Sequence, residues 1–213
     1  MFYGELEARG WTCVGGITGR SELLELARSV GKPVPSPTGE LIKELSPVLQ
    51  PDGRKGTLSD TYAGGKFPLH TDTAFWPIPS RYILLRVRGD IRRCTTILTF
   101  TDLFRGGPDI MRTLASESVW LARTRSRSAY CSMRFRCGDA VGWRYDPQCM
   151  IPANSAAARV QKMVGSVLSC SRVEYINWTD DMAVILCNWE VLHGRGSSPM
   201  READRILERV YVA

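Results

Sequence analysis

The two histidines of this 213-residue sequence each stand in a segment suited to metal chemistry. His70 lies two residues before Asp72, and residues so spaced in an extended segment point to the same side. The other histidine, His193, stands in the segment NWEVLHGRG, residues 188–196. Two neutral imidazoles and one carboxylate form the facial triad of non-haem Fe(II) oxygenases, which leaves coordination positions open. These three residues are therefore candidate iron ligands, with packing or core hydrogen bonding as the alternative for the histidines.

Arginines supply the second chemical signal. Arg205 and Arg209 lie four residues apart, and such positions share one face of a strand, so both could point into one opening of the fold. A planar guanidinium binds a carboxylate through two hydrogen bonds, as the distal end of a dicarboxylate co-substrate requires. The alternative for Arg205 is a surface salt bridge. Arg144 has two open roles: it holds the core through Asp146, or it faces the substrate.

Composition and charge indicate a globular protein with an anionic partner. Hydrophobic residues make up 44% of the chain and charged residues 23%, and the length suits one domain over residues 1–213. The net charge of +6 comes largely from arginines in 81–93 and 123–136. This charge favours a small carboxylate, sulfonate or phosphate, or a nucleic acid backbone, and a solvated basic face is the alternative. Aromatic residues are not regularly interleaved with these arginines, so no segment resembles a dedicated RNA-binding motif, and a nucleic acid partner is not the favoured expectation.

Neither a membrane partner nor export is expected. The apolar runs are too short to span a bilayer, and the N-terminus lacks a basic segment followed by an apolar one. The seven cysteines show no Cys-x-x-Cys spacing and are odd in number, which argues against a disulfide framework or a structural zinc site. We therefore expect a cytoplasmic protein with reduced cysteines.

The elements that must position these residues are many short strands and a few helices. Periodicity predicts strands over 9–18, 41–49, 81–88, 94–100, 173–178, 182–188 and 205–212. It predicts helices from Thr18 or Ser21 to Gly31, over 109–121, and from Asn154 to 168. Residues 51–66 form a long loop leading to His70. Without regular βαβ alternation, this pattern predicts a mainly β fold with added helices on a jelly-roll core.

The sequence resembles the Fe(II)/2-oxoglutarate-dependent dioxygenases of the taurine dioxygenase and clavaminate synthase-like superfamily. The resembling segments follow the family's order: GKFPLHTD at 65–72, TTIL at 95–98, RYD at 144–146, residues 188–195, and the closing Arg205 and Arg209. The resemblance implies a double-stranded β-helix, or cupin-like jelly roll, with a trimmed lid because the chain is short for the family.

The resemblance also implies roles for single residues. His70, Asp72 and His193 are the implied iron ligands. Arg205 is the implied partner of the distal carboxylate of 2-oxoglutarate, and Thr96 its hydroxyl partner, with Thr95 as the alternative because an Arg-Arg-Cys run replaces the family's Gly-Gly pair. Arg209 would lie near the co-substrate or the acid group of the substrate, so Arg209 and Arg144 are the expected substrate-binding residues.

The implied activity uses Fe(II) with 2-oxoglutarate and O2 as co-substrates. It hydroxylates an unactivated C–H bond of a small molecule, an amino acid or another acid-bearing metabolite of specialised metabolism. Asp72 favours hydroxylation, because halogenases of the superfamily replace this carboxylate to make room for chloride. Two alternatives stay open: the same chemistry on a nucleic acid or protein, and a catalytically silent jelly-roll binding protein.

Overall fold

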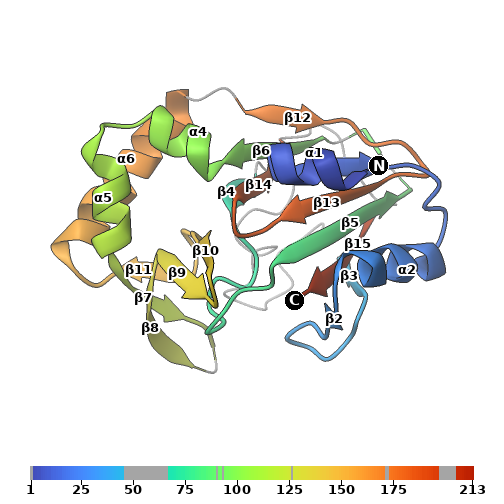
Figure 1. Cartoon of the computed structure of the whole chain (residues 1–213), viewed down its shortest axis with the longest axis horizontal. Coiled ribbons are helices and arrows are strands. Elements are labelled where there is room, and N and C mark those ends of the chain that lie inside the picture. The colour runs from blue at the N-terminus through green and yellow to red at the C-terminus, as the bar shows by residue number, and fades with distance from the viewer. Residues whose placement is uncertain are drawn as a thin grey trace.

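Two antiparallel sheets form the centre of the fold in the computed structural model (Figure 1). The structure describes residues 2–45, 67–89, 91–92, 94–125, 127–170, 173–196 and 205–213. The larger sheet has the order β1-β13-β5-β15-β2, with β3 also paired to β15. Its strands are β1 (Trp11–Val14), β2 (Pro33–Val34), β3 (Lys43–Leu45), β5 (Tyr82–Arg88), β13 (Ala183–Cys187) and β15 (Ile206–Val212).

The smaller sheet carries both histidines. Its order is β12-β6-β14-β4, and its strands are β4 (Phe67–His70), β6 (Thr95–Thr99), β12 (Glu174–Ile176) and β14 (Val191–Arg195). One buried apolar cluster contains side chains of both sheets, among them Leu85 and Val184 of the larger sheet and Ile97 and Val191 of the smaller sheet. The inner faces of the two sheets therefore pack on each other, which is the arrangement of a jelly roll.

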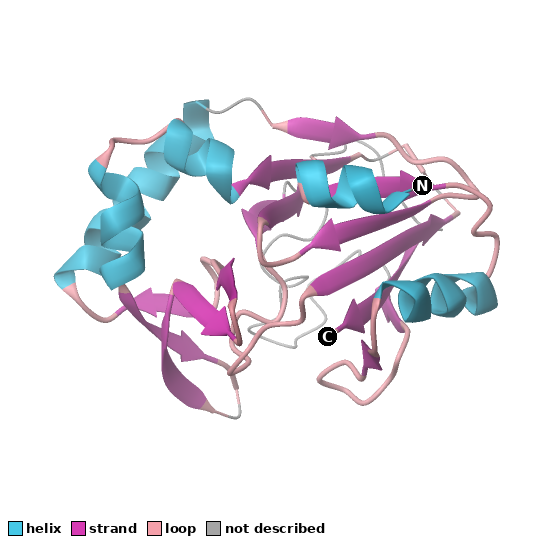
Figure 2. Cartoon of the chain, viewed as in Figure 1, coloured by secondary structure: helices cyan, strands magenta, loops and turns pink. Residues whose placement is uncertain are grey.

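Helices cover the outer faces of both sheets. On the larger sheet, α1 (Phe2–Arg9) and α2 (Arg20–Val30) contribute to a cluster with alternate residues of β5, β13 and β15. On the smaller sheet, Leu69, Leu98 and Leu192 pack in a second cluster with α4 (Phe100–Arg105), α5 (Ile110–Glu117) and α6 (Ser155–Cys170). Figure 2 shows these three helices gathered at one end of the molecule. None of the described helices is long and apolar enough to cross a membrane.

Two small sheets complete the same end of the molecule. A three-stranded sheet has the order β11-β7-β8, and β9 pairs with β10. The strands are β7 (Val119–Arg123), β8 (Ser128–Ser132), β9 (Arg134–Cys137), β10 (Ala140–Trp143) and β11 (Met150–Pro152). The turn between β10 and β11 matters for the site, because the Thr71 N–H donates to the Tyr145 carbonyl at 2.8 Å.

The mainly β fold with added helices and a jelly-roll core is confirmed. The strand predictions for 81–88, 94–100, 182–188 and 205–212 match β5, β6, β13 and β15 within about two residues. The Asn154 cap is confirmed, since its Oδ1 accepts from the Ala157 N–H at 2.8 Å. The strand predicted over 41–49 is β3 in its described part, while 46–49 and the loop 51–66 lie outside the described residues.

Two local predictions need correction, and one helix was not predicted. The helix expected over 109–121 ends at Glu117, because Ser118 is extended (φ −72°, ψ 132°) and the residues after it enter the sheet as β7. Neither Thr18 nor Ser21 caps α2, whose N-cap is Gly19 without a side-chain hydrogen bond. Helix α1 was not predicted, because its apolar periodicity is weak and Leu6 is its one buried residue.

Candidate metal centre

Strand register brings the two histidines together. His193 pairs with His70 across β14 and β4 and with Ile97 across β14 and β6. Residues directly opposite each other point to the same side of a sheet, and Ile97 belongs to the cluster between the sheets. Both imidazoles therefore face the interior of the jelly roll, with ring centroids 4.5 Å apart.

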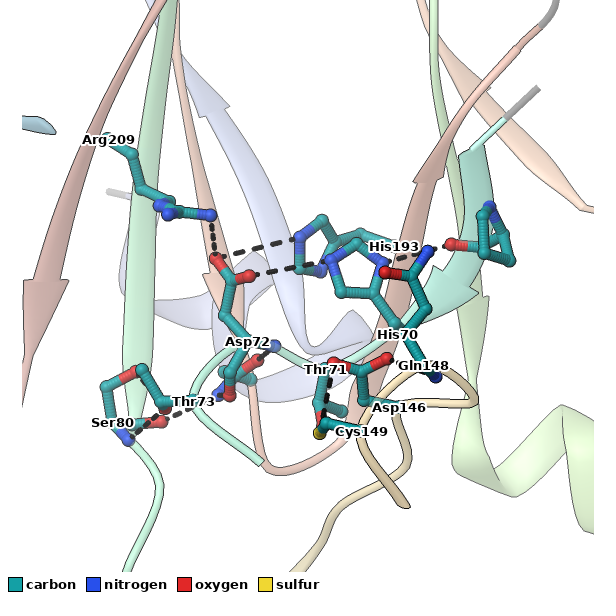
Figure 3. Close-up of polar contacts among 12 residues, drawn as sticks. His70, Thr71, Asp72, Thr73, Ser80, Asp146, Gln148, Cys149, His193 and Arg209 are labelled. Atoms are coloured by element: carbon teal, nitrogen blue, oxygen red, sulfur yellow. Dashed lines mark hydrogen bonds and ion pairs between the residues drawn. The ribbon is translucent and has the colours of Figure 1, made fainter. Parts of the chain in front are cut away.

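Asp72 reaches the histidines from a turn. Strand β4 ends at His70, so Asp72 lies beyond the extended segment that the sequence analysis assumed, yet its carboxylate still meets both rings (Figure 3). Its Oδ1 lies 3.5 Å from His70 Nε2, and its Oδ2 lies 4.0 Å from His193 Nε2. The three candidate ligand atoms lie within 4.8 Å of one another, and all three residues are buried.

The tautomer of His70 suits metal binding. Its Nδ1 lies 3.0 Å from the Pro68 carbonyl oxygen, which can only accept, so Nδ1 carries the proton. In the neutral ring the lone pair of Nε2 lies on the side that faces Asp72, where a bound metal would replace the proton that Asp72 otherwise accepts. A ligating histidine almost always has its other ring nitrogen held in this way. Two imidazole nitrogens and a carboxylate oxygen are also a donor set that suits Fe(II), so the residues present fit the implied metal.

The electrostatics of the cluster set the charge on each group. Burial raises the pKa of Asp72, but Arg209, His70 and His193 outweigh it and hold that pKa below its ordinary value. Burial and the charges of His70 and Arg209 lower the pKa of His193 to about 3. Burial also opposes the charged form of His70, yet the hydrogen bond and charge of Asp72 leave its pKa raised. An ionised carboxylate and a neutral His193 are the forms that a metal requires.

Strand β15 places both arginines toward the interior. Leu207 and Tyr211 belong to the cluster between the sheets, and Arg209 shares their side of the strand. The same alternation places Arg205, which directly precedes β15 and is 5% exposed, on that side. Arg209 Nη1 donates to Asp72 Oδ2 at 2.8 Å, so Arg209 directly contacts one of the three candidate metal ligands. Arg205 and Arg209 therefore lie on one face of the strand, as their spacing predicts.

The register of β6 separates the two threonines. Ile97 lies opposite His193, Thr96 opposite Gly194 and Thr95 opposite Arg195, without a bulge between β6 and β14. Thr95 therefore shares the inner face with His193, and Thr96, the residue that the resemblance favours, points to the outer face. The Thr95 hydroxyl accepts from Trp178 Nε1 at 3.2 Å. The buried Thr96 hydroxyl has no hydrogen-bond partner among the described residues.

Arg144 holds the turn that follows Asp72. Its Nη1 donates to the carbonyl oxygens of Ala74 at 3.0 Å and Trp76 at 2.7 Å, and its Nη2 donates to that of Pro77 at 2.9 Å. The guanidinium is buried, and these contacts match neither a bond to Asp146 nor a side chain open to substrate. The expectation that Arg144 binds substrate is therefore not supported by its contacts.

Sequence reasoning gave no role to two residues beside the site. Asn188 is fully buried and hydrogen-bonds both backbone groups of Asp72. Gln148 lies in the same turn as Asp146, whose charge acts on His70, and Gln148 Nε2 is buried without a hydrogen-bond partner among the described residues. Asn188 could have been found from the sequence, because it lies in the same segment as His193. No spacing rule points to Gln148.

Comparisons with known proteins place this geometry in a known fold. Neither the models of protein families nor the curated proteins give a match to the sequence. Among solved structures, an asparagine oxygenase in complex with Fe(II), 3-hydroxyasparagine and succinate aligns with a TM-score of 0.79 at 16% identity, over 99% of this chain and 76% of that chain. The non-haem iron oxygenase OrfP, in complex with Fe and alpha-ketoglutaric acid, aligns with a TM-score of 0.72 at 19% identity, over 100% and 77%. The chain thus has the fold of these oxygenases.

Proposed function

We propose that this protein is an Fe(II)- and 2-oxoglutarate-dependent dioxygenase that hydroxylates an unactivated C–H bond of a small molecule. The observation that carries the proposal is the meeting of His70, Asp72 and His193, with their ligand atoms within 4.8 Å, inside a jelly roll. The solved structures that share this fold support it, because their ligands are iron with 2-oxoglutarate or succinate. We also propose that residues 1–213 form one catalytic domain and that the protein is cytoplasmic.

Each residue of the site has a distinct task in this proposal. His70, Asp72 and His193 hold Fe(II), which when bound supplies O2 activation coupled to the oxidative decarboxylation of 2-oxoglutarate. Arg205 binds the distal carboxylate of 2-oxoglutarate through its planar guanidinium. Thr95 is the hydroxyl partner that the strand register favours, with Thr96 as the alternative. The buried interior of the jelly roll excludes water from these groups.

The proposed substrate is an amino acid or another metabolite with an acid group. Arg209 is a cation in the site, and its guanidinium has donors beyond the one that Asp72 accepts, so a substrate carboxylate can share it. Gln148 Nε2 offers a further buried donor. The neighbours support this class, since the asparagine oxygenase carries hydroxyasparagine and OrfP has been solved with (3S)-hydroxy-L-Arg.

Succinate formation tests this function directly. Protein loaded with Fe(II) without oxygen is mixed with 2-oxoglutarate and a panel of amino acids and organic acids, and O2 is then admitted. We expect metal-dependent succinate that rises with one or a few panel members and is lost in His70→Ala. Absence of both succinate and 2-oxoglutarate binding would refute the proposal and leave the jelly-roll binding protein in its place.

A second candidate keeps the chemistry and changes the target to an acidic macromolecule. The supporting observation is a group of exposed arginines on and beside β7 and β9: Arg123, Arg127, Arg134 and Arg136. Several such contacts would make binding fall steeply with salt, whereas binding of a small amino acid would fall little. Comparing substrate-dependent succinate formation at low and high salt separates the two candidates.

A further inference from the structure

The carboxamide of Asn188 holds both peptide groups of Asp72. Asn188 Oδ1 accepts from the Asp72 N–H at 2.8 Å, and Asn188 Nδ2 donates to the Asp72 carbonyl oxygen at 2.9 Å. The second hydrogen of Nδ2 goes to the Ser80 carbonyl oxygen at 2.9 Å. Asn188 is fully buried, so no water competes for these bonds. One side chain thus fixes the backbone on either side of a candidate metal ligand.

The residue after Asp72 adopts a conformation that needs such support. Thr73 has φ 54°, and no other non-glycine residue has a positive φ in the part of the chain that the structure describes. The left-handed region is unfavourable for a β-branched residue and persists only where neighbours enforce it. Here the Ser80 N–H donates to Thr73 Oγ1 at 3.0 Å. Because Asn188 also holds Ser80, the three residues form one connected support around Asp72.

The same residue also ties Asp72 to the strand of His193. Asn188 lies in the turn between β13 and β14, and its own N–H donates to the Arg81 carbonyl at 2.8 Å. Strand β14 begins three residues later and carries His193. The His70–Asp72 half of the site and the His193 half are therefore joined through Asn188.

We propose that Asn188 is a positioning residue that, with the Thr73–Ser80 pair, fixes the direction of the Asp72 carboxylate before a metal arrives. With both peptide groups held, only the two side-chain torsions of Asp72 stay free, and Arg209 restrains these by holding Oδ2. A ligand set aligned in advance binds a metal without the entropy cost of ordering it. The inference rests on the metal site of the proposed function.

Metal affinity, measured apart from turnover, tests this role. Mn(II) is the probe, because it does not need oxygen-free handling and because the electron paramagnetic resonance signal of the free ion reports binding. We expect Asn188→Ala to bind Mn(II) about 10- to 100-fold more weakly than the wild-type protein, as is typical when a ligand loses its support. Asn154→Ala is the control, since Asn154 also bonds three backbone groups, those of Ala157, Val119 and Glu117. It should keep the wild-type affinity.

A second variant guards against misfolding of Asn188→Ala. Thr73→Gly removes the hydroxyl and frees the turn, while glycine adopts φ 54° without strain, so the fold should survive. We expect it to weaken Mn(II) binding severalfold in a protein that still unfolds cooperatively, because relief of the strained φ offsets part of the cost of the Ser80 N–H left without its acceptor. Wild-type affinity in Thr73→Gly, or equal loss in Asn188→Ala and Asn154→Ala, overturns the role of Asn188. If wild-type protein binds Mn(II) but forms no succinate, the proposed function fails. The Mn(II) affinities of the variants then still test the role of Asn188.

Discussion

Arg209 Nη1 and Asp72 Oδ2 lie 2.8 Å apart, so a partly buried guanidinium holds one oxygen of the carboxylate that faces both histidines. Asp72 Oδ1 stays on the side of His70 Nε2, at 3.5 Å. This division leaves one carboxylate oxygen for a metal and reserves the other for the arginine. It also places a positive charge next to a site proposed for a divalent cation.

Removing that charge is expected to strengthen metal binding. In Arg209→Met, the guanidinium no longer competes for Asp72 or repels the cation, so Mn(II) should bind about threefold more tightly or better at neutral pH. The stimulation of succinate formation by an acidic substrate should fall in the same variant. Mn(II) titration and succinate assays measure the two effects. The control is Arg105→Met, a change at an exposed arginine. If Mn(II) bound more weakly to Arg209→Met and not to Arg105→Met, Arg209 would act mainly by orienting Asp72.

The two threonines of β6 should differ in their effect on 2-oxoglutarate. Thr95→Val is expected to weaken binding of 2-oxoglutarate by about tenfold, the usual loss for a hydrogen bond to a charged group, because Thr95 lies on the face of His193. Thr96→Val should leave it nearly unchanged. Calorimetry on Mn(II)-loaded protein measures both affinities. A larger loss in Thr96→Val than in Thr95→Val would support Thr96, the residue that the family resemblance favours. It would count against a contact between Thr95 and 2-oxoglutarate.

The three candidate metal ligands could be predicted because histidine is scarce in this chain. With two histidines and a carboxylate two residues after the first, few ligand sets were possible. The route by which Asp72 reaches the site could not be predicted. It depends on the end of β4 and on the contacts of Asn188, which lies 116 residues away in the sequence.

The threonine contact and the role of Arg144 could not be predicted from the sequence either. A shift of one residue in register moves every side chain to the other face, and the sequence does not give the register of β6 against β14. The partners of Arg144 are backbone carbonyls 67–70 residues earlier in the chain. Any residue supplies a carbonyl, so no residue type marks these partners in the sequence.

Metal-free protein should lose stability as the pH falls below the ordinary pKa of histidine. Burial lowers the pKa of His193 from 6.5 to about 3, so below about pH 6.5 the unfolded chain takes up a proton that the folded protein excludes. The raised pKa of His70 adds no slope there, because both states then carry its proton. As the pH falls from about 6 to 5, the slope of the free energy of unfolding should approach about 1.4 kcal/mol per pH unit, because the unfolded His193 is then almost fully protonated. Urea denaturation at a series of pH values measures this free energy. The variant His193→Gln, whose side chain cannot titrate, should have a flatter dependence on pH. An unchanged dependence would show that another group causes it.

Replacing Arg144 should disturb the metal site through the turn that follows Asp72. Arg144→Met keeps the apolar stem but leaves the carbonyl oxygens of Ala74, Trp76 and Pro77 without their donor, and an unsatisfied group costs about 1–3 kcal/mol where it is buried, as at Ala74. We expect the free energy of unfolding to fall by about 3 kcal/mol and Mn(II) to bind more weakly, because this turn directly follows Asp72 in the chain. The control is Arg134→Met, at an exposed arginine at the start of β9. Wild-type stability with a loss confined to the affinity for an acidic substrate would instead make Arg144 a substrate-binding residue.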